Sequence, residues 1–231
     1  MNRRPSISRF CRSPFPRRAA VTLVVLAYSS LAFGGAIHDA ASAGDLEKVK
    51  ALLKANPNLV FSKDTNGLTP LHFAAANGHK DVAELLLANK AEVDAKSNAK
   101  TTRGGTPLHL AAMNGREDVA ALLLASKADA NAKDNDGETP LHRVAVQGHK
   151  DVAALLLANK ADVNARERNG LTPLHLAAEF GSKDVVVLLL ANKADVNASD
   201  HKGRTALDWA KGHKEVMAVL LQAITAAKDT R

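Results

Sequence analysis

The tetrapeptide Thr-Pro-Leu-His occurs four times in this chain of 231 residues, at nearly regular intervals. The copies begin at Thr69, Thr106, Thr139 and Thr172, so the intervals are 37, 33 and 33 residues, and a degenerate copy begins 33 residues later at Thr205. A fixed period of this length indicates one small supersecondary unit that is copied and stacked on itself. We therefore expect an elongated array of units, not a closed globular domain.

Each copy predicts a pair of short helices. In the first copy Thr69 can cap a helix that begins at Pro70, where the missing N–H of proline costs nothing. Gly78 tolerates positive φ and ends this helix. A second helix follows, because Val82 and the leucines at 85–87 give an apolar face at helical spacing. Both helices are too short to be stable alone, so each pair must bury its apolar side against neighbouring pairs.

The full repeated string resembles that of the ankyrin repeat proteins. It stands as TPLHLAA at Thr106–Ala112 and again at Thr172–Ala178, each followed by Gly, a Val-containing helix, Leu-Leu-Leu and Ala-Asp-x-Asn. The ankyrin unit has 33 residues and carries Thr-Pro-Leu-His-x-Ala. The resemblance covers about residues 36–228 and implies an all-α solenoid of stacked helix-turn-helix units with projecting turns.

About six repeats are expected, including degenerate copies at both ends. A weaker first copy begins at Ile37, with Leu52 and Leu53 closing its second helix, and a decayed last copy surrounds Trp209. End copies are atypical because one of their faces meets water. We expect the repeat domain to cover residues 37–231, with repeats at approximately 37–63, 64–96, 97–133, 134–166, 167–199 and 200–228.

Residues 1–36 have a different composition. They contain six arginines and no acidic residue, and an uncharged run extends from Ala19 to Ile37. The basic start, the apolar core and the small residues between positions 32 and 36 predict a secretory signal peptide. The alternative is an uncleaved N-terminal membrane anchor, because about 19 uncharged residues nearly cross a bilayer core as a helix.

Two further targeting signals fit residues 1–36 less well. A mitochondrial presequence would be amphipathic, whereas Ala19 to Leu26 is apolar all round. A twin-arginine signal has weak support from the residues around its arginine pairs. Both favoured interpretations place the repeats outside the cytoplasm, because the arginines stay inside. We therefore expect an exported protein of bacterial type, periplasmic or secreted if the leader is cleaved, and otherwise a single-pass membrane protein.

The charge of the expected mature chain is close to neutral. The sequence has 31 basic and 24 acidic residues, and six of the bases precede Ile37, which leaves 25 against 24. A nucleic-acid partner is not expected, because its phosphates require a basic face. Only four aromatic residues remain after Ile37, too few to stack bases or sugars. Cys11, the single cysteine, also lies in the leader.

The histidines do not predict a metal site. Four of them hold the same place in successive copies, at His72, His109, His142 and His175. Neighbouring packed helices lie about 8–10 Å apart, whereas zinc needs nitrogen ligands at about 2.0–2.1 Å, so adjacent copies cannot share an ion. The resemblance implies that each imidazole hydrogen-bonds near the loop of its own or the next repeat. His79, His149 and His213 follow the glycine between two helices, and we expect them in a solvated link.

No catalytic constellation is predicted. Catalysis needs unlike groups at one place, whereas repetition spreads like groups along a line. One aspartate per repeat lies just before Val at the start of a second helix, where it favours the helix dipole: Asp81, Asp118, Asp151 and Asp184. Another set is expected to order loops, namely Asp129, Asp162 and Asp195. We expect no enzyme, no cofactor and no metal.

The candidate binding residues are those that differ between otherwise identical copies. The resemblance implies a concave binding side made of turn tips and of exposed residues near the end of each first helix. The corresponding pairs are Ala76 and Asn77, Met113 and Asn114, Val146 and Gln147, and Glu179 and Phe180. Drift at solvent-exposed sites explains any single difference equally well. Exposed Met113, Val146 and Phe180 on one side would form an apolar patch.

Three departures from the repeat stand out, and the first two add to this prediction. The turn between Asp94 and Thr106 is four residues longer than its counterparts and contains three bases, with Lys100 and Arg103 as candidate contacts to an acidic partner. A tolerated flexible loop is the alternative, because lengthening a loop costs little. Arg143 replaces an apolar residue and either snorkels from the helix edge or forms an ion pair.

The third departure concerns four lysines after the second helices, where the family usually has glycine: Lys90, Lys127, Lys160 and Lys193. If positive φ is needed there, each lysine costs about 1 kcal/mol.

The sequence therefore favours a non-catalytic scaffold that binds a protein partner through the concave face of a solenoid. We expect a monomer on the exported side of a membrane. The alternative function is a membrane-tethered structural spacer, in which residues 19–37 persist as an anchor and provide the only membrane contact.

Overall fold

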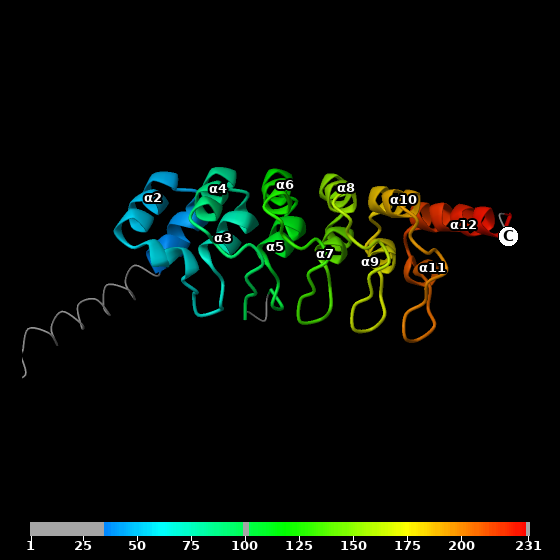
Figure 1. The fold of residues 1–231 in the computed structure, drawn as a ribbon. Helices are drawn as coiled ribbons and strands as arrows, with labels where there is room; N and C mark the ends of the chain where they lie inside the picture. The colour runs from blue at the N-terminus through cyan, green and yellow to red at the C-terminus, as the bar shows by residue number, and fades with distance from the viewer. Residues whose placement is uncertain (1–34, 99–101, 230–231) are drawn as a thin grey trace, which may run out of the picture.

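The structure is a computed structural model that describes residues 35–98 and 102–229, and it is an elongated stack of helix pairs (Figure 1). The predicted leader, apart from its last two residues, and the candidate Lys100 lie outside the described residues. Figure 1 shows the second helix of each pair in one row and the first helices in a parallel row, with the turns projecting beyond the first helices.

The helices follow one another in pairs. A helix over residues 35–43 precedes α2 and a short 3-10 helix, η1. The bounds are α2 Leu46–Ala55, η1 Pro57–Phe61, α3 Pro70–Asn77, α4 Lys80–Ala88, α5 Pro107–Met113, α6 Glu117–Ala125, α7 Pro140–Gln147, α8 Lys150–Ala158, α9 Pro173–Glu179, α10 Lys183–Ala191, α11 Ala206–Trp209 and α12 Lys214–Asp229. The predicted all-α solenoid of about six repeats is confirmed.

The ends of the first helices follow from their sequence. Thr69 has extended backbone angles, and the helix begins at Pro70, whose fixed φ suits a first helical position. Gly78 ends α3 with φ of 82°, a left-handed conformation that glycine adopts without a Cβ clash. In α5 the helix ends one residue earlier relative to the repeat, at Met113, and Gly115 takes the positive φ.

One continuous apolar core runs the length of the stack. The first helices contribute the leucine of each Thr-Pro-Leu-His string, and the second helices contribute the middle leucine of each triplet. All are fully or almost fully buried: Leu71, Leu108, Leu141 and Leu174 in the first row, and Leu86, Leu123, Leu156 and Leu189 in the second. Since no repeat closes a core alone, each depends on its neighbours for burial.

The turns also contact each other through their backbones. Each turn donates one N–H to a carbonyl of the preceding turn, as from Asn98 to Asn66 at 2.8 Å and from Arg168 to Asp136 at 2.9 Å. The longer turn between Asp94 and Thr106 keeps this pattern, because the N–H of Asn135 in the next turn lies 2.7 Å from the carbonyl oxygen of Arg103. The turns are therefore held in a row.

The two ends of the stack differ from its centre. After α2 the chain forms η1, which the sequence analysis did not anticipate and which places Leu59 and Val60 in the core. At the other end α11 has only four residues, whereas α12 has 16. In the part of the chain that the structure describes, no helix combines the length and the apolar character needed to cross a bilayer.

The four lysines after the second helices have positive φ, which answers the question that the sequence left open at this glycine-like position. The angles are 66° at Lys90, 69° at Lys127, 65° at Lys160 and 66° at Lys193. A side chain in this left-handed region costs free energy that glycine avoids.

Candidate protein-interaction surface

Buried histidines join each repeat to the next. The Nδ1 atom of His109 accepts the backbone N–H of Thr106 at 3.1 Å and lies 2.9 Å from the threonine hydroxyl. Its Nε2 atom faces the carbonyl oxygen of Glu138 at 3.0 Å. Because a backbone N–H can only donate and a carbonyl can only accept, the ring is neutral with its proton on Nε2. The expected role of these histidines is confirmed.

The same arrangement recurs along the stack. The imidazole Nε2 atoms reach carbonyl oxygens of the following repeat in four places: His72 to Gly105, His109 to Glu138, His142 to Leu171 and His175 to Arg204. In the first repeat, His38 Nε2 lies 3.2 Å from the carbonyl oxygen of Ser62, at the end of the same repeat. Burial lowers the pKa of His72, His109 and His142 to about 4, and it also lowers the pKa of His175. The neutral form is thus the one that the fold requires.

A second set of bonds links the repeats at the glycine between the two helices. His149 is half-buried, and its Nε2 atom donates to the carbonyl of Met113 at 3.2 Å. Its ring packs so closely on Gly115 that a Cβ there would lie 2.7 Å from Nδ1. His79 and His213 make equivalent bonds to Ser42 and Glu179, both at 2.9 Å. These histidines therefore do more than occupy a solvated link, which corrects our expectation.

In each of four turns, a carboxylate oxygen accepts hydrogen bonds from two backbone N–H groups of the same turn. One oxygen of Asp134 accepts the backbone N–H groups of Asp136 at 2.9 Å and Glu138 at 3.0 Å. Asp64, Glu167 and Asp200 bind the amides two and four residues later in the same way. Asp134 and Glu167 are only 6% and 8% exposed. The acid side chains of these turns therefore point into the protein.

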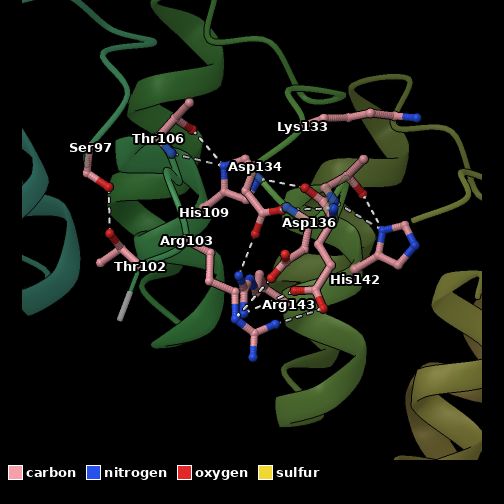
Figure 2. A network of polar contacts seen from close by, with 12 residues as sticks. Ser97, Thr102, Arg103, Thr106, His109, Lys133, Asp134, Asp136, His142 and Arg143 are labelled. Atoms are coloured by element: carbon pink, nitrogen blue, oxygen red, sulfur yellow. Dashed lines mark hydrogen bonds and ion pairs between the residues drawn. The ribbon is translucent and has the colours of Figure 1, made fainter. Parts of the chain in front are cut away.

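Arg143 forms ion pairs with two acids of its own turn (Figure 2). Its Nη2 atom binds the second oxygen of Asp134, and its Nη1 atom lies 3.0 Å from Glu138 Oε2, without hydrogen-bond geometry. Burial raises the pKa of the Glu138 carboxyl above its ordinary value, against the opposing effect of Arg143. Of the two alternatives for Arg143, the structure shows the ion pair.

Arg103, at the end of the longer turn, is also held by acids of the next turn. Its guanidinium lies 3.3 Å from Asp136 and 3.3 Å from Glu138 (Figure 2). Its φ is 51°, which places it among the positive-φ residues. A partner that binds Arg103 must compete with these two carboxylates, so contact with an acidic partner stays a prediction.

The predicted binding pairs have a consistent pattern of exposure. The second member of each pair is exposed, at Asn77, Asn114, Gln147 and Phe180, whereas the first member is half-buried, at Ala76, Met113, Val146 and Glu179. Their role in binding stays a prediction. Met113 and Val146 contribute less apolar surface than we expected, because both are half-buried and Val146 packs against the apolar core.

Phe180 is the most distinctive of these side chains. It is 52% exposed, and it replaces the asparagine or glutamine found at this position in the three preceding repeats. Those asparagines have a local role: Asn77 and Asn114 donate to carbonyl oxygens four residues earlier, at 3.0 and 2.8 Å. Phenylalanine cannot make that bond, so its exposed ring gains no local hydrogen bond from this position.

Among the described residues, no three His, Cys, Asp or Glu side chains are grouped so that they could hold a metal ion. The buried polar side chains are instead engaged with backbone groups or with each other. The arrangement supports shape, charge and hydrogen-bond recognition at exposed positions of a fixed frame.

Comparison with known proteins agrees with this architecture. The family model described as "Ankyrin repeats (3 copies)" matches the chain three times, over residues 30–97, 94–167 and 159–230. The three matches together cover most of the chain, so the match extends over the whole described stack.

Several curated proteins are similar to parts of the chain. Human protein phosphatase 1 regulatory subunit 27 is 37% identical over 84 residues, which are 36% of this chain and 52% of that protein. A probable E3 ubiquitin-protein ligase from Oryza sativa subsp. japonica is 36% identical over 78 residues, 33% of this chain and 16% of the ligase. Human ankyrin repeat domain-containing protein 7 is 43% identical over 56 residues, 24% of this chain and 22% of that protein. The chain therefore spans about half, or less, of the relatives it matches.

Proposed function

Because the chain belongs to the ankyrin repeat family, we propose that it is a non-catalytic scaffold that binds a protein partner through its turns and the exposed ends of its first helices. The relatives share only repeat segments with it, so their activities do not transfer. The proposal includes export: the repeats act as a monomer beyond a membrane, after a leader of about 36 residues has been cleaved.

One contrast supports this proposal most strongly. Positions that hold the stack together are nearly invariant from repeat to repeat, as Leu108 and Leu141 or His109 and His142 show. The exposed position at the end of the first helix changes instead, from asparagine to Gln147 and then to phenylalanine. A frame that is fixed by buried contacts and varied at exposed sites suits recognition of one partner surface with little loss of conformational entropy.

Capture from the source cells tests the binding proposal. The wild-type protein is compared with a Gln147→Arg/Phe180→Ser double variant and with Val187→Ser, which removes an apolar side chain that is 46% exposed on α10. We expect a partner whose recovery, measured by quantitative mass spectrometry, falls at least about tenfold with the double variant and stays unchanged with Val187→Ser. Equal recovery with all three proteins, or no partner at all, would contradict the proposal.

N-terminal sequencing of the native product tests the export proposal. A start near Ile37 in the periplasmic or secreted fraction supports a cleaved signal peptide. An intact N-terminus in the membrane fraction supports the spacer with its uncleaved anchor, and recovery from the cytoplasm contradicts both.

A further inference from the structure

A row of exposed bases runs along the turns, with one base in each of four successive repeats. Its members, called the basic row here, are Lys63, Lys96, Lys133 and Arg166. Each is the last residue of its repeat and stands one residue before the turn position at which the second, fourth, fifth and sixth repeats carry a buried or half-buried acid. In the fifth repeat Ser199 takes the place of the base.

Hydrogen bonds hold the basic row in register. Lys96 Nζ donates to the carbonyl of Lys133 at 2.9 Å, and Lys133 Nζ donates to the carbonyl of Arg166 at 3.3 Å. Arg166 in turn donates to the carbonyl of Ser199 at 2.7 Å. Lys96, Lys133 and Arg166 thus each point towards the equivalent position in the next repeat. The four extra residues of the longer turn lie between Lys96 and Lys133 in the sequence. The hydrogen bond between these two residues shows that the insertion does not separate them in space.

The charges of the basic row are not neutralised by the protein. Among the described residues, no carboxylate forms an ion pair with any of its four members, whereas Arg103, Arg143 and Arg204 all have such pairs. The acids next in sequence to Lys133 and Arg166 are buried and bind backbone amides. An ammonium has three N–H donors, so Lys96 and Lys133 each keep two for a ligand.

The lysines with positive φ provide a contrast. They form a second exposed row, but an acid follows two residues after each, and Asp129, Asp162 and Asp195 are exposed beside Lys127, Lys160 and Lys193. Exposed carboxylates therefore accompany that row in sequence, whereas the acids next to Lys133 and Arg166 in the basic row are buried.

The spacing of the basic row indicates the kind of ligand. Stacked repeats place equivalent residues about 8–10 Å apart, as packed helices do. A peptide in the extended polyproline II conformation rises about 3.1 Å per residue with three residues per turn, so residues three apart lie about 9 Å from each other on the same face. A chain with an acidic side chain at every third position can therefore set one carboxylate opposite each base.

We propose that the basic row binds an extended acidic segment of a protein partner, with acidic residues at intervals of three. This inference rests on the proposed function and adds the chemistry of the partner. The row provides charge complementarity along a line, while the exposed first-helix ends contact the rest of the partner.

Fluorescence anisotropy with two labelled twelve-residue peptides tests the proposal at low salt. One peptide has aspartate at every third position with Ser and Gly between, and the other has the same composition with its four aspartates adjacent. We expect the spaced peptide to bind several-fold more tightly. Lys96→Gln/Lys133→Gln should weaken its binding about fivefold, because one exposed ion pair changes affinity by roughly one- to fivefold.

Two further variants sharpen the test. Lys90→Gln/Lys127→Gln removes the same charge from the same two repeats outside the row and should leave the affinity unchanged. Ser199→Lys extends the row by one base and should tighten binding of a fifteen-residue peptide with five spaced aspartates about two- to threefold. The Ser199 carbonyl that accepts from Arg166 is a backbone group and is kept.

Several results would overturn the proposal. These are equal affinity for the two peptides, an equal loss with the control double variant, or tighter binding of inorganic polyphosphate through the same lysines. If the native partner is still captured through Gln147 and Phe180 while no acidic peptide binds, this inference fails and the proposed function stands. If no partner is captured at all, the proposed function itself fails.

Discussion

His109 Nε2 lies 3.0 Å from the backbone carbonyl oxygen of Glu138 in the following repeat. Nδ1 of the same ring accepts a hydrogen bond from the backbone N–H of Thr106, the residue that caps its own helix. One neutral side chain therefore fixes both a helix start and the contact between two repeats. Because the pattern recurs in every central repeat, local stability and coupling along the stack depend on the same groups.

Removing this ring should destabilise the protein. His109→Ala leaves the Thr106 amide and the Glu138 carbonyl without their partner and opens a cavity, which together cost about 3 kcal/mol. Urea unfolding measures the change. His201→Ala removes an exposed imidazole at a turn tip and should cost under about 1 kcal/mol. Similar losses for both variants would contradict the structural role of the buried ring.

Acid should weaken the fold in a defined pH window. Three buried histidines have pKa values of about 4, whereas an unfolded histidine titrates near 6.5, so the unfolded state binds more protons between these values. Their stabilisation is complete above about pH 6.5 and is lost as the pH falls towards 4. Each ring contributes a slope of about 1.4 kcal/mol per pH unit inside the window.

Denaturant unfolding at pH 7, 6 and 5 checks this slope. His109→Ala should have a smaller dependence on pH than the wild type, because one of the titrating rings is gone. A free energy of unfolding that stays constant from pH 7 to 5 would show that these rings are not forced to be neutral.

The lysines with positive φ are sites for stabilisation. Lys160→Gly should raise the free energy of unfolding by about 0.5–1 kcal/mol, because glycine adopts the left-handed conformation without strain. Ala154→Gly places the same residue in the middle of α8, at an exposed helical position of the same repeat. That variant should lose about 1 kcal/mol. Thermal and urea unfolding of both variants give the comparison, and equal signs would contradict the explanation.

The Arg143 cluster makes a prediction that needs a pair of substitutions. Arg143→Leu leaves the buried Asp134 and the half-buried Glu138 without the guanidinium of Arg143, and it should cost about 3–5 kcal/mol. Adding Glu138→Leu recreates the pattern of the fifth repeat, where Leu171 and Leu176 accompany the buried Glu167. The double variant should recover most of the loss. A double-mutant cycle by urea unfolding measures it, and simple additivity of the two losses would contradict the ion-pair assignment.

In the described part of the chain, the side chain of Ser182 makes no hydrogen bond to the preceding repeat at the glycine between the two helices. Ser182 stands where His149 and His213 reach back to carbonyls of the preceding repeat, and its hydroxyl faces Gly148. Ser182→His should add a hydrogen bond to the Val146 carbonyl and stabilise the protein by about 1 kcal/mol. His149→Ser should lose about the same amount. Unfolding experiments on the two variants test this, and a destabilised Ser182→His would mean that the site has no room for the ring.

The periodicity of the sequence predicted the frame because the frame depends on residue types that recur. Thr69, Pro70 and Gly78 signal helix ends through local backbone chemistry, and the histidine bonds and the positive φ of Lys160 follow from a shared position in the repeat. These properties depend on the residues of one repeat or on its alignment with the next repeat. Both can be read from a single sequence.

Side chains whose environment depends on tertiary packing were harder to predict. The ion pair of Arg143 required knowing that the carboxylate of Asp134 is turned inward, and Val146 is partly buried because it packs against the apolar core. The basic row went unnoticed because Lys96 and Lys133 are 37 residues apart, while the other spacings are 33. Only the hydrogen bond between them shows that they hold equivalent positions.

The most direct test of the proposed scaffold is photocrosslinking in the native cells. A benzophenone amino acid is placed at Phe180 or Gln147 on the proposed binding side, or at Ala154 on the outer helix row as the control. We predict that one protein partner crosslinks at Phe180 and Gln147 and not at Ala154. Crosslinking of the same proteins with equal yield at all three positions, or of none at Phe180 and Gln147, would contradict the proposal that this face binds a partner.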